Sequence, residues 1–352
     1  MDIEFHYYMT YLIARRAEFK KNDAFPIAYS SQYTDDNQET YRIVDNDSGK
    51  AYLNYLSQTE DITKPQEDRL NVYPLFHFCP AAKEEAFVRS PMRRDGHLSL
   101  LTTIPGNGNA RRILKESLNS RSLHRVGIAT HMYADSFCHK DFTGWKDDFN
   151  YTKLGGFLGA IWSSVGPAIG HALAMHNPDI PSLIWVDERL ALTSPDRVKK
   201  NKDQILAAAG SIFDYYCEFK GKSKASQIKK RLISDLGEAI GDEVENVDKA
   251  TSEKDNRIAK YEALIGNDFI KYSPSEWFDS TVESRDSDPS GTSGQSDTTY
   301  MWKKDYKNSD WYKFQEAVKQ HHDFALSVLK ETFDLMGITD TLLKCVPKDD
   351  GG

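Results

Sequence analysis

Three residues that can bind a metal ion follow one another at four-residue spacing: His131, Asp135 and His139. On an α-helix, positions i, i+4 and i+8 lie above one another on one face, so we expect these side chains to point in the same direction. Two imidazoles and a carboxylate form the mixed nitrogen and oxygen set that catalytic zinc sites use when one position stays open for water. The spacing therefore predicts one wall of a zinc site.

Further candidate ligands lie on both sides of this helix in the sequence. A predicted helix at residues 27–37 ends near Asp35 and Asp36. The helix dipole disfavours negative charge at that end, so a nearby cation would offset the cost. His77 lies between aromatic residues and prolines, which favour an extended or turn conformation that fixes its direction. The remaining candidates are His6 in the first predicted helix, His171 and Asp179.

Composition limits the function classes. A chain of 352 residues with 39% hydrophobic residues can bury a substantial core. The formal net charge of -8 argues against a strong nucleic-acid surface, because such surfaces neutralise phosphates with Lys and Arg. The four cysteines form no CxxC pair, so they indicate neither a disulfide framework nor a thiolate zinc site. Two acidic residues precede any apolar run at the N-terminus, which is unlike a secretory signal, and we expect a cytoplasmic protein.

Helical periodicity recurs along the chain and convincing strand alternation is rare, so the sequence predicts an all-α, multi-helix globular fold with long loops. We expect a helical metal-binding catalytic domain at residues 1–272, with its ligands within residues 1–185. Residues 273–309 are rich in Ser, Gly and Asp, which predicts a polar loop or lid. In segment 310–352 we expect a C-terminal helix that packs on the same domain.

Two other stretches leave alternatives open. Residues 40–44 and 51–56 could form short strands or connecting turns. Residues 154–175 contain no Lys, Arg, Asp or Glu and are long enough to span a bilayer, but they contain five glycines and a proline. We expect a buried helix pair that lines the site; a peripheral membrane contact and a transmembrane segment are the alternatives.

The order and types of these residues resemble the zinc-dependent phospholipase C and single-strand nuclease superfamily, most closely a bacterial branch of it. The resemblance covers roughly residues 1–185, and its most specific part is the His131-xxx-Asp135-xxx-His139 helix. It implies a nearly all-helical fold that holds one to three zinc ions, of which we expect two. In the family the last histidine is followed by an acidic residue four positions later, whereas position 175 is Met here and the carboxylate is Asp179.

The resemblance also implies roles for the candidate ligands. The first zinc would be held by Asp36 (or Asp35), His77, His131 and Asp135. The second would be held by His139, His171 and Asp179, and His6 together with Asp135 would remain for a third.

The chemistry that such a cluster supports is hydrolysis of a phosphoester, in a lipid or a nucleotide, because two metal ions can bind the attacking and leaving oxygens of an in-line displacement. Asp135 would bridge or orient the metal ions, and a carboxylate of the pair Asp35 and Asp36 would act as general base. The second N–H group of each histidine would need an acceptor such as a backbone carbonyl. Two alternatives are a metal-stabilised binding or structural module without turnover and a membrane-associated effector.

Overall fold

The structure is a computed structural model of the chain. It describes residues 1–45, 48–59, 70–150, 169–171, 174, 176–222, 226–286 and 298–339. Most of the residues 154–175, for which we expected a helix pair or a membrane contact, therefore lie outside the described residues.

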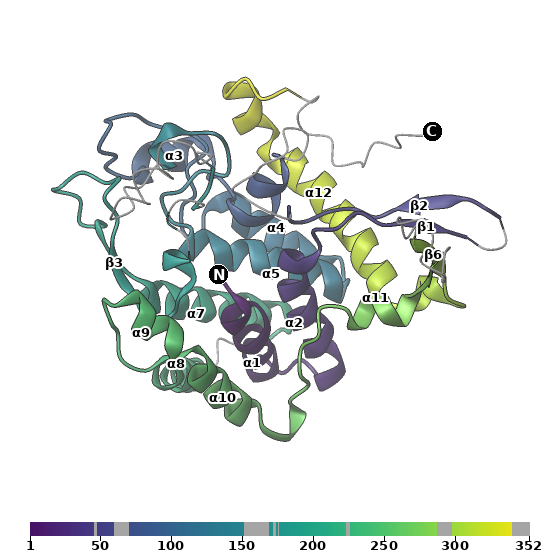
Figure 1. Cartoon of the computed structure of the whole chain (residues 1–352). Coiled ribbons are helices and arrows are strands. Elements are labelled where there is room, and N and C mark those ends of the chain that lie inside the picture. The colour runs from purple at the N-terminus through teal and green to yellow at the C-terminus, as the bar shows by residue number, and fades with distance from the viewer. Residues whose placement is uncertain are drawn as a thin grey trace.

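The central element is helix α5 (Leu123–Cys138), which lies in the middle of the molecule in Figure 1. It starts where the Ser122 hydroxyl accepts a hydrogen bond from the Arg125 backbone N–H, the usual way to satisfy a free donor at a helix N-terminus. Nearly all of its side chains are buried, because other helices pack on every side of it. These neighbours are α2 (Lys21–Asp36), α4 (Gly108–Asn119), α7 (Asn201–Phe219) and α12 (Asp310–Leu335).

The remaining helices surround this central group. The chain begins with a π-helical segment, η1 (Glu4–Met9), which continues into α1 (Thr10–Arg16). The other helices are η3 (Tyr73–His77), α3 (Lys83–Arg89), α8 (Ser226–Ile240), α9 (Val247–Ser252), α10 (Lys254–Ile265) and α11 (Glu276–Thr281). Single 3-10 turns occur at η4 (Asp148–Asn150), η6 (Asn177–Asp179), η7 (Gly266–Asp268) and η8 (Tyr306–Asn308).

The prediction of an all-α fold is wrong, because the structure contains two small sheets. One has the strand order β2-β1-β6-β5. Its strands are β1 (Arg42–Val44), β2 (Ala51–Leu53), β5 (Val282–Asp286) and β6 (Thr298–Trp302). Strands β1 and β6 are parallel, with Ile43 opposite Tyr300, and the other pairs are antiparallel. The second sheet pairs β3 (Ile184–Val186) with β4 (Val198–Lys200).

The segment 273–309, which we expected to be a polar loop or lid, contains α11, β5 and β6. Its aromatic side chains attach it to the core: the Trp277 ring stacks on Tyr29 with ring centres 3.8 Å apart, and both side chains are buried. Aromatic burial of this kind outweighs the polar composition of the segment. Helix α12 packs on α5 and α4, as Figure 1 shows. Its His321 donates a hydrogen bond to the Leu75 carbonyl oxygen.

Helices α2 and α5 approach each other closely at Gly127. A Cβ atom built at this position would lie 2.4 Å from the Ile27 carbonyl oxygen and 2.6 Å from Ser30 Cβ. Only a residue without a Cβ allows this approach. The close approach matters for the site because Asp35 lies in the last turn of α2 and His131 lies one turn after Gly127 on α5.

We predict that Gly127→Ala destabilises the protein by about 1–3 kcal/mol, because the added methyl group overpacks the contact between α2 and α5. Gly237→Ala is the matched control: in α8 the nearest atom to the new Cβ is Leu206 Cδ1 at 3.6 Å. There the higher helix propensity of Ala should stabilise the protein by up to about 1 kcal/mol. Urea unfolding of both variants measures the difference, and equal effects would contradict the close approach.

Candidate metal centre

Asp135, in the second half of α5, is the carboxylate around which the candidate ligands converge. Its side chain is 1% exposed. Its Oδ2 lies 3.1 Å from His131 Nε2 and 3.3 Å from His77 Nδ1. Its Oδ1 lies 3.2 Å from His6 Nε2 and 2.5 Å from the α-amino nitrogen of Met1. One buried carboxylate is therefore shared by nitrogens from three parts of the chain.

The first group of ligand atoms has the dimensions of a tetrahedral metal site. Asp35 Oδ1 lies 3.6 Å from His131 Nε2 and 3.7 Å from His77 Nδ1, and the two imidazole nitrogens are 3.0 Å apart. In a tetrahedral zinc site with bonds of about 2.0–2.1 Å, neighbouring ligand atoms are about 3.3 Å apart. Three of these residues, His77, His131 and Asp135, therefore could hold one metal ion, and Asp35 lies beside them in this first group.

Hydrogen bonds on the far side of the rings determine which nitrogens face Asp135. His131 Nδ1 lies 2.7 Å from the Ser31 carbonyl oxygen, and His77 Nε2 lies 2.9 Å from that of Ser57. A carbonyl oxygen only accepts, so these two nitrogens carry the N–H groups. When both rings are neutral, as metal binding requires, His131 Nε2 and His77 Nδ1 present lone pairs toward Asp135 Oδ2. Several acceptors at one buried point repel one another unless a cation lies between them.

A second group of three residues lies beside the first. His139 Nε2 is 3.3 Å from Asp179 Oδ1, and His171 Nε2 is 3.6 Å from Asp179 Oδ2. The Nδ1–H of His139 donates to the His77 carbonyl oxygen at 3.2 Å, which leaves Nε2 as the ligand atom. The Met1 nitrogen lies 3.2 Å from Asp179 Oδ1 and 3.4 Å from His139 Nε2. His139, His171 and Asp179 also could hold a metal ion.

His6 is close to the first group but not part of the same tetrahedron. Its ring stacks on His131 with ring centres 3.8 Å apart, and its Nε2 lies 3.9 Å from Asp35 Oδ2. Among the residues that the structure describes, none forms a hydrogen bond with this buried Nε2. His6, Asp35 and His131 form a third set of ligand atoms that could hold an ion. This set shares two residues with the first group, so it extends the same site.

The environment favours the protonation states that bind metal. Burial lowers the pKa of His139 to about 4 and that of His6 well below its ordinary value. Burial alone would raise the pKa of Asp135, but the neighbouring His139, Met1 ammonium and His131 outweigh this effect and hold it well below the ordinary value. Neutral imidazoles beside ionised carboxylates are the forms that coordinate zinc.

His131 differs from the other histidines. Burial lowers its pKa, but Asp135 and Asp35 outweigh burial and raise the pKa above the ordinary value. A metal ion would therefore have to displace a proton from His131.

Local backbone geometry directs two of the ligands. His6 lies in η1 and His77 lies in η3, which are both π-helical segments. Such segments are rare, occur frequently at functional sites, and rotate a side chain away from the direction that a regular α-helix would give it. The sequence shows no simple signal for them.

The structure brings seven of the predicted ligands together and leaves Asp36 outside the cluster. Asp36 Oδ2 accepts hydrogen bonds from the Tyr272 hydroxyl at 2.5 Å and from Gln32 Nε2 at 3.2 Å. Adjacent residues on a helix point about 100° apart, so only one residue of the pair can face α5. That residue is Asp35. The seven predicted ligands are His6, His77, His131, Asp135, His139, His171 and Asp179, and Asp35 joins them in place of Asp36.

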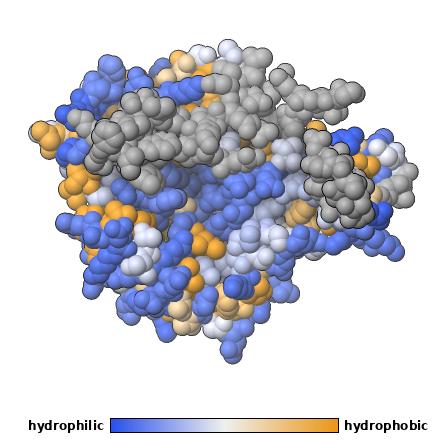
Figure 2. All heavy atoms as spheres, in the orientation of Figure 1, coloured by the Kyte–Doolittle hydropathy of each residue, from blue (hydrophilic) through white to orange (hydrophobic). Residues whose placement is uncertain are grey.

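A cavity of about 420 Å³ opens beside the cluster. Asp35, Asp135 and Asp179 contribute to its wall, together with polar side chains that include Gln58 and Lys254. In Figure 2 the middle of this face, where Figure 1 places the N-terminus, is mainly hydrophilic. The cluster is therefore accessible to a small polar molecule.

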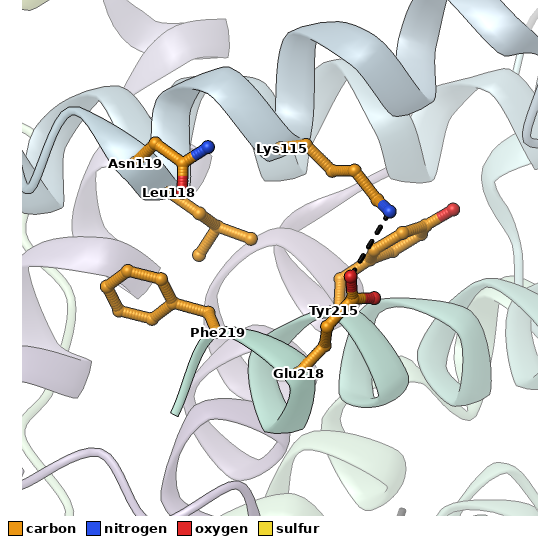
Figure 3. A pocket seen from close by; sticks show the side chains of 6 residues that line it. All are labelled: Lys115, Leu118, Asn119, Tyr215, Glu218 and Phe219. Atoms are coloured by element: carbon orange, nitrogen blue, oxygen red, sulfur yellow. Dashed lines mark hydrogen bonds and ion pairs between the residues drawn. The ribbon is translucent and has the colours of Figure 1, made fainter. Parts of the chain in front are cut away.

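A second cavity, of about 340 Å³, lies between α4 and α7 (Figure 3). Lys115 on α4 faces Tyr215 and Glu218 on α7, and the Lys115 and Glu218 side chains form an ion pair at 3.3 Å. The described residues that line it include no His, Asp or Cys. It lacks the ligand set of the first cavity.

The sequence predicts carbonyl acceptors for the histidine N–H groups but not which carbonyls, and it gives no sign of the Met1 amine at the site. The Met1 amine lies between Asp135 and Asp179. The carbonyl oxygens of Ser31 and Ser57 orient the His131 and His77 rings. Backbone groups leave no mark in a pattern of residue types, so no motif could have revealed them.

Comparison with known proteins places the chain in a family. The chain belongs to the "Family of unknown function (DUF6765)", whose profile matches residues 1–329. A search of the curated proteins and a search of the solved structures each found no match. Within the described part of the chain, none of the helices has the length and apolar character needed to cross a bilayer.

We predict that Asp135→Ala weakens zinc binding at both groups by more than about 100-fold, because it removes a shared ligand, and even an indirect partner of a ligand contributes about 10–100-fold. His97→Ala, at an exposed histidine outside the cluster, is the control and should leave zinc affinity unchanged. Titration against a chromophoric chelator measures both variants. Parental affinity in Asp135→Ala would mean that Asp135 is not a ligand.

Proposed function

We propose that this protein is a zinc-dependent hydrolase of a phosphoester. The observation that carries the proposal is the pair of ligand groups on either side of Asp135, beside a cavity of about 420 Å³. A metal site that only stabilises a fold is closed by its protein ligands, whereas a catalytic site leaves room for water and substrate. The resemblance of residues 1–185 to the zinc-dependent phospholipase C and single-strand nuclease superfamily supports the same function.

The ligand set fits zinc better than calcium or magnesium. Imidazole nitrogens make up half or more of each group, and calcium and magnesium prefer oxygen ligands. His77, His131 and Asp135 would hold one ion, with Asp35 beside them, and His139, His171 and Asp179 would hold the second. When bound, two zinc ions supply Lewis acidity and a nucleophile at neutral pH.

The protein residues have separate roles in this proposal. Asp135 would keep the two groups together, because its two oxygens face different partners. Asp35 is the most exposed of the three carboxylates, at 24% against 1% for Asp135 and 9% for Asp179, and it lines the cavity. Burial raises the pKa of Asp35, although the nearby histidines oppose this effect. These properties make Asp35 the residue that would accept a proton from the attacking water.

The zinc-loaded protein should hydrolyse bis(4-nitrophenyl) phosphate, and Asp35→Asn should lower kcat by about 10²–10⁴-fold, because an amide cannot accept the proton. The assay follows nitrophenolate release with excess zinc and again after chelation. His97→Ala should keep the parental rate. A zinc-loaded parent that stays folded and gives no hydrolysis above buffer would contradict the proposal and favour a metal-stabilised module without turnover.

A further inference from the structure

A buried ion pair between Glu4 and Arg257 joins η1 to α10. Arg257, on α10, donates from Nε to Glu4 Oε2 and from Nη2 to Glu4 Oε1, both at 2.8 Å. Glu4 is fully buried and Arg257 is 2% exposed. Two parallel hydrogen bonds between a guanidinium and a carboxylate fix orientation as well as distance. The pair therefore holds η1 in one position on α10.

The third nitrogen of Arg257 contacts two further segments. Its Nη1 donates to the Ala250 carbonyl oxygen at 2.7 Å and lies 3.3 Å from Ser182 Oγ. Ala250 lies in α9, and Ser182 follows Asp179 by three residues. All three guanidinium nitrogens thus have partners.

Through Glu4 and Ser182, these contacts link Arg257 to the segments that carry two candidate ligands, His6 and Asp179. Glu4 precedes His6 by two residues within η1. On the other side, Ser182 lies in the short segment that connects Asp179 to β3. The first ligand group, in contrast, comes from α2, η3 and α5. In the described part of the chain, the hydrogen bonds of Arg257 reach none of those three elements.

We propose that Arg257 is a positioning residue for the second ligand group. It fixes the positions of η1 and of the segment that carries Asp179 relative to His139. The proposal rests on the proposed function, because it assumes that both groups bind zinc. It assigns a role to the part of the chain beyond residue 185, whose described residues belong to none of the ligand groups. Loss of the guanidinium should release one of two zinc ions and keep the other.

The first test is Arg257→Met in the full-length chain. We expect zinc content after dialysis against a zinc buffer to fall from two equivalents to one. Cobalt substitution should show the visible absorption of one site only. Arg257→Lys keeps the charge but not the paired hydrogen bonds, and should recover part of the second equivalent. Arg16→Met, which removes a half-buried ion pair with Asp235, is the matched control and should retain two equivalents.

Arg257→Met leaves the Glu4 carboxylate buried without its partner and could unfold the protein for that reason alone. The double variant Glu4→Met and Arg257→Met avoids this problem, since an apolar pair of similar volume often preserves stability. We expect this variant to keep the parental Tm without metal and still to bind one equivalent.

The outcomes separate this inference from the proposed function. The role of Arg257 would be overturned if the double variant bound two zinc equivalents at parental affinity, or if it bound no zinc. Hydrolysis by the parent would be unaffected by either result. A parent that takes up no zinc would overturn the proposed function, and the role of Arg257 with it.

Discussion

The structure depends on one buried place, around Asp135 and Asp179, where imidazole nitrogens and carboxylate oxygens face one another. His77, His131 and His139 each direct one N–H group to a backbone carbonyl oxygen. Their other nitrogens then face the carboxylates of Asp135 and Asp179. Lone pairs and negative charges at distances of 3.1 to 3.3 Å are costly to bury without a cation. The Met1 ammonium, 2.5 Å from Asp135 Oδ1 and 3.2 Å from Asp179 Oδ1, supplies one positive charge, and the ligand groups on both sides could hold metal ions that supply more.

The fold satisfies the constraint by placing α5 at the centre and covering it from all sides. Gly127 lets α2 approach closely enough for Asp35 to reach the histidines. The π-helical segments η1 and η3 turn His6 and His77 toward the same point. Much of the rest of the chain supports these elements, as the pair of Glu4 and Arg257 illustrates. Catalytic geometry of this kind requires ligands held by rigid neighbours as well as the ligands themselves.

The sequence predicts this centre better than it predicts the fold. Four-residue spacing places His131, Asp135 and His139 on one side of a helix, and in the structure a nitrogen of each histidine lies within 3.6 Å of Asp135 Oδ2. The sequence does not show which of Asp35 and Asp36 faces the histidines, because that depends on the angle at which α2 meets α5. Strands β1 and β2 lie within residues 40–44 and 51–56, for which short strands were one of the two alternatives. The sheet itself was not predicted, because β1 and β6 are three and five residues long and pair across more than 250 positions, which no local pattern records. In segment 273–309, aromatic side chains such as Trp277 attach the described residues to the core despite the polar composition, and residues 287–297 lie outside the described residues.

The most direct measurement of the central claim is anomalous diffraction at the zinc edge from crystals of the zinc-loaded protein. We expect two peaks near Asp135, one among His77, His131 and Asp135 and the other among His139, His171 and Asp179. Peaks only at surface residues, or none near Asp135, would contradict it.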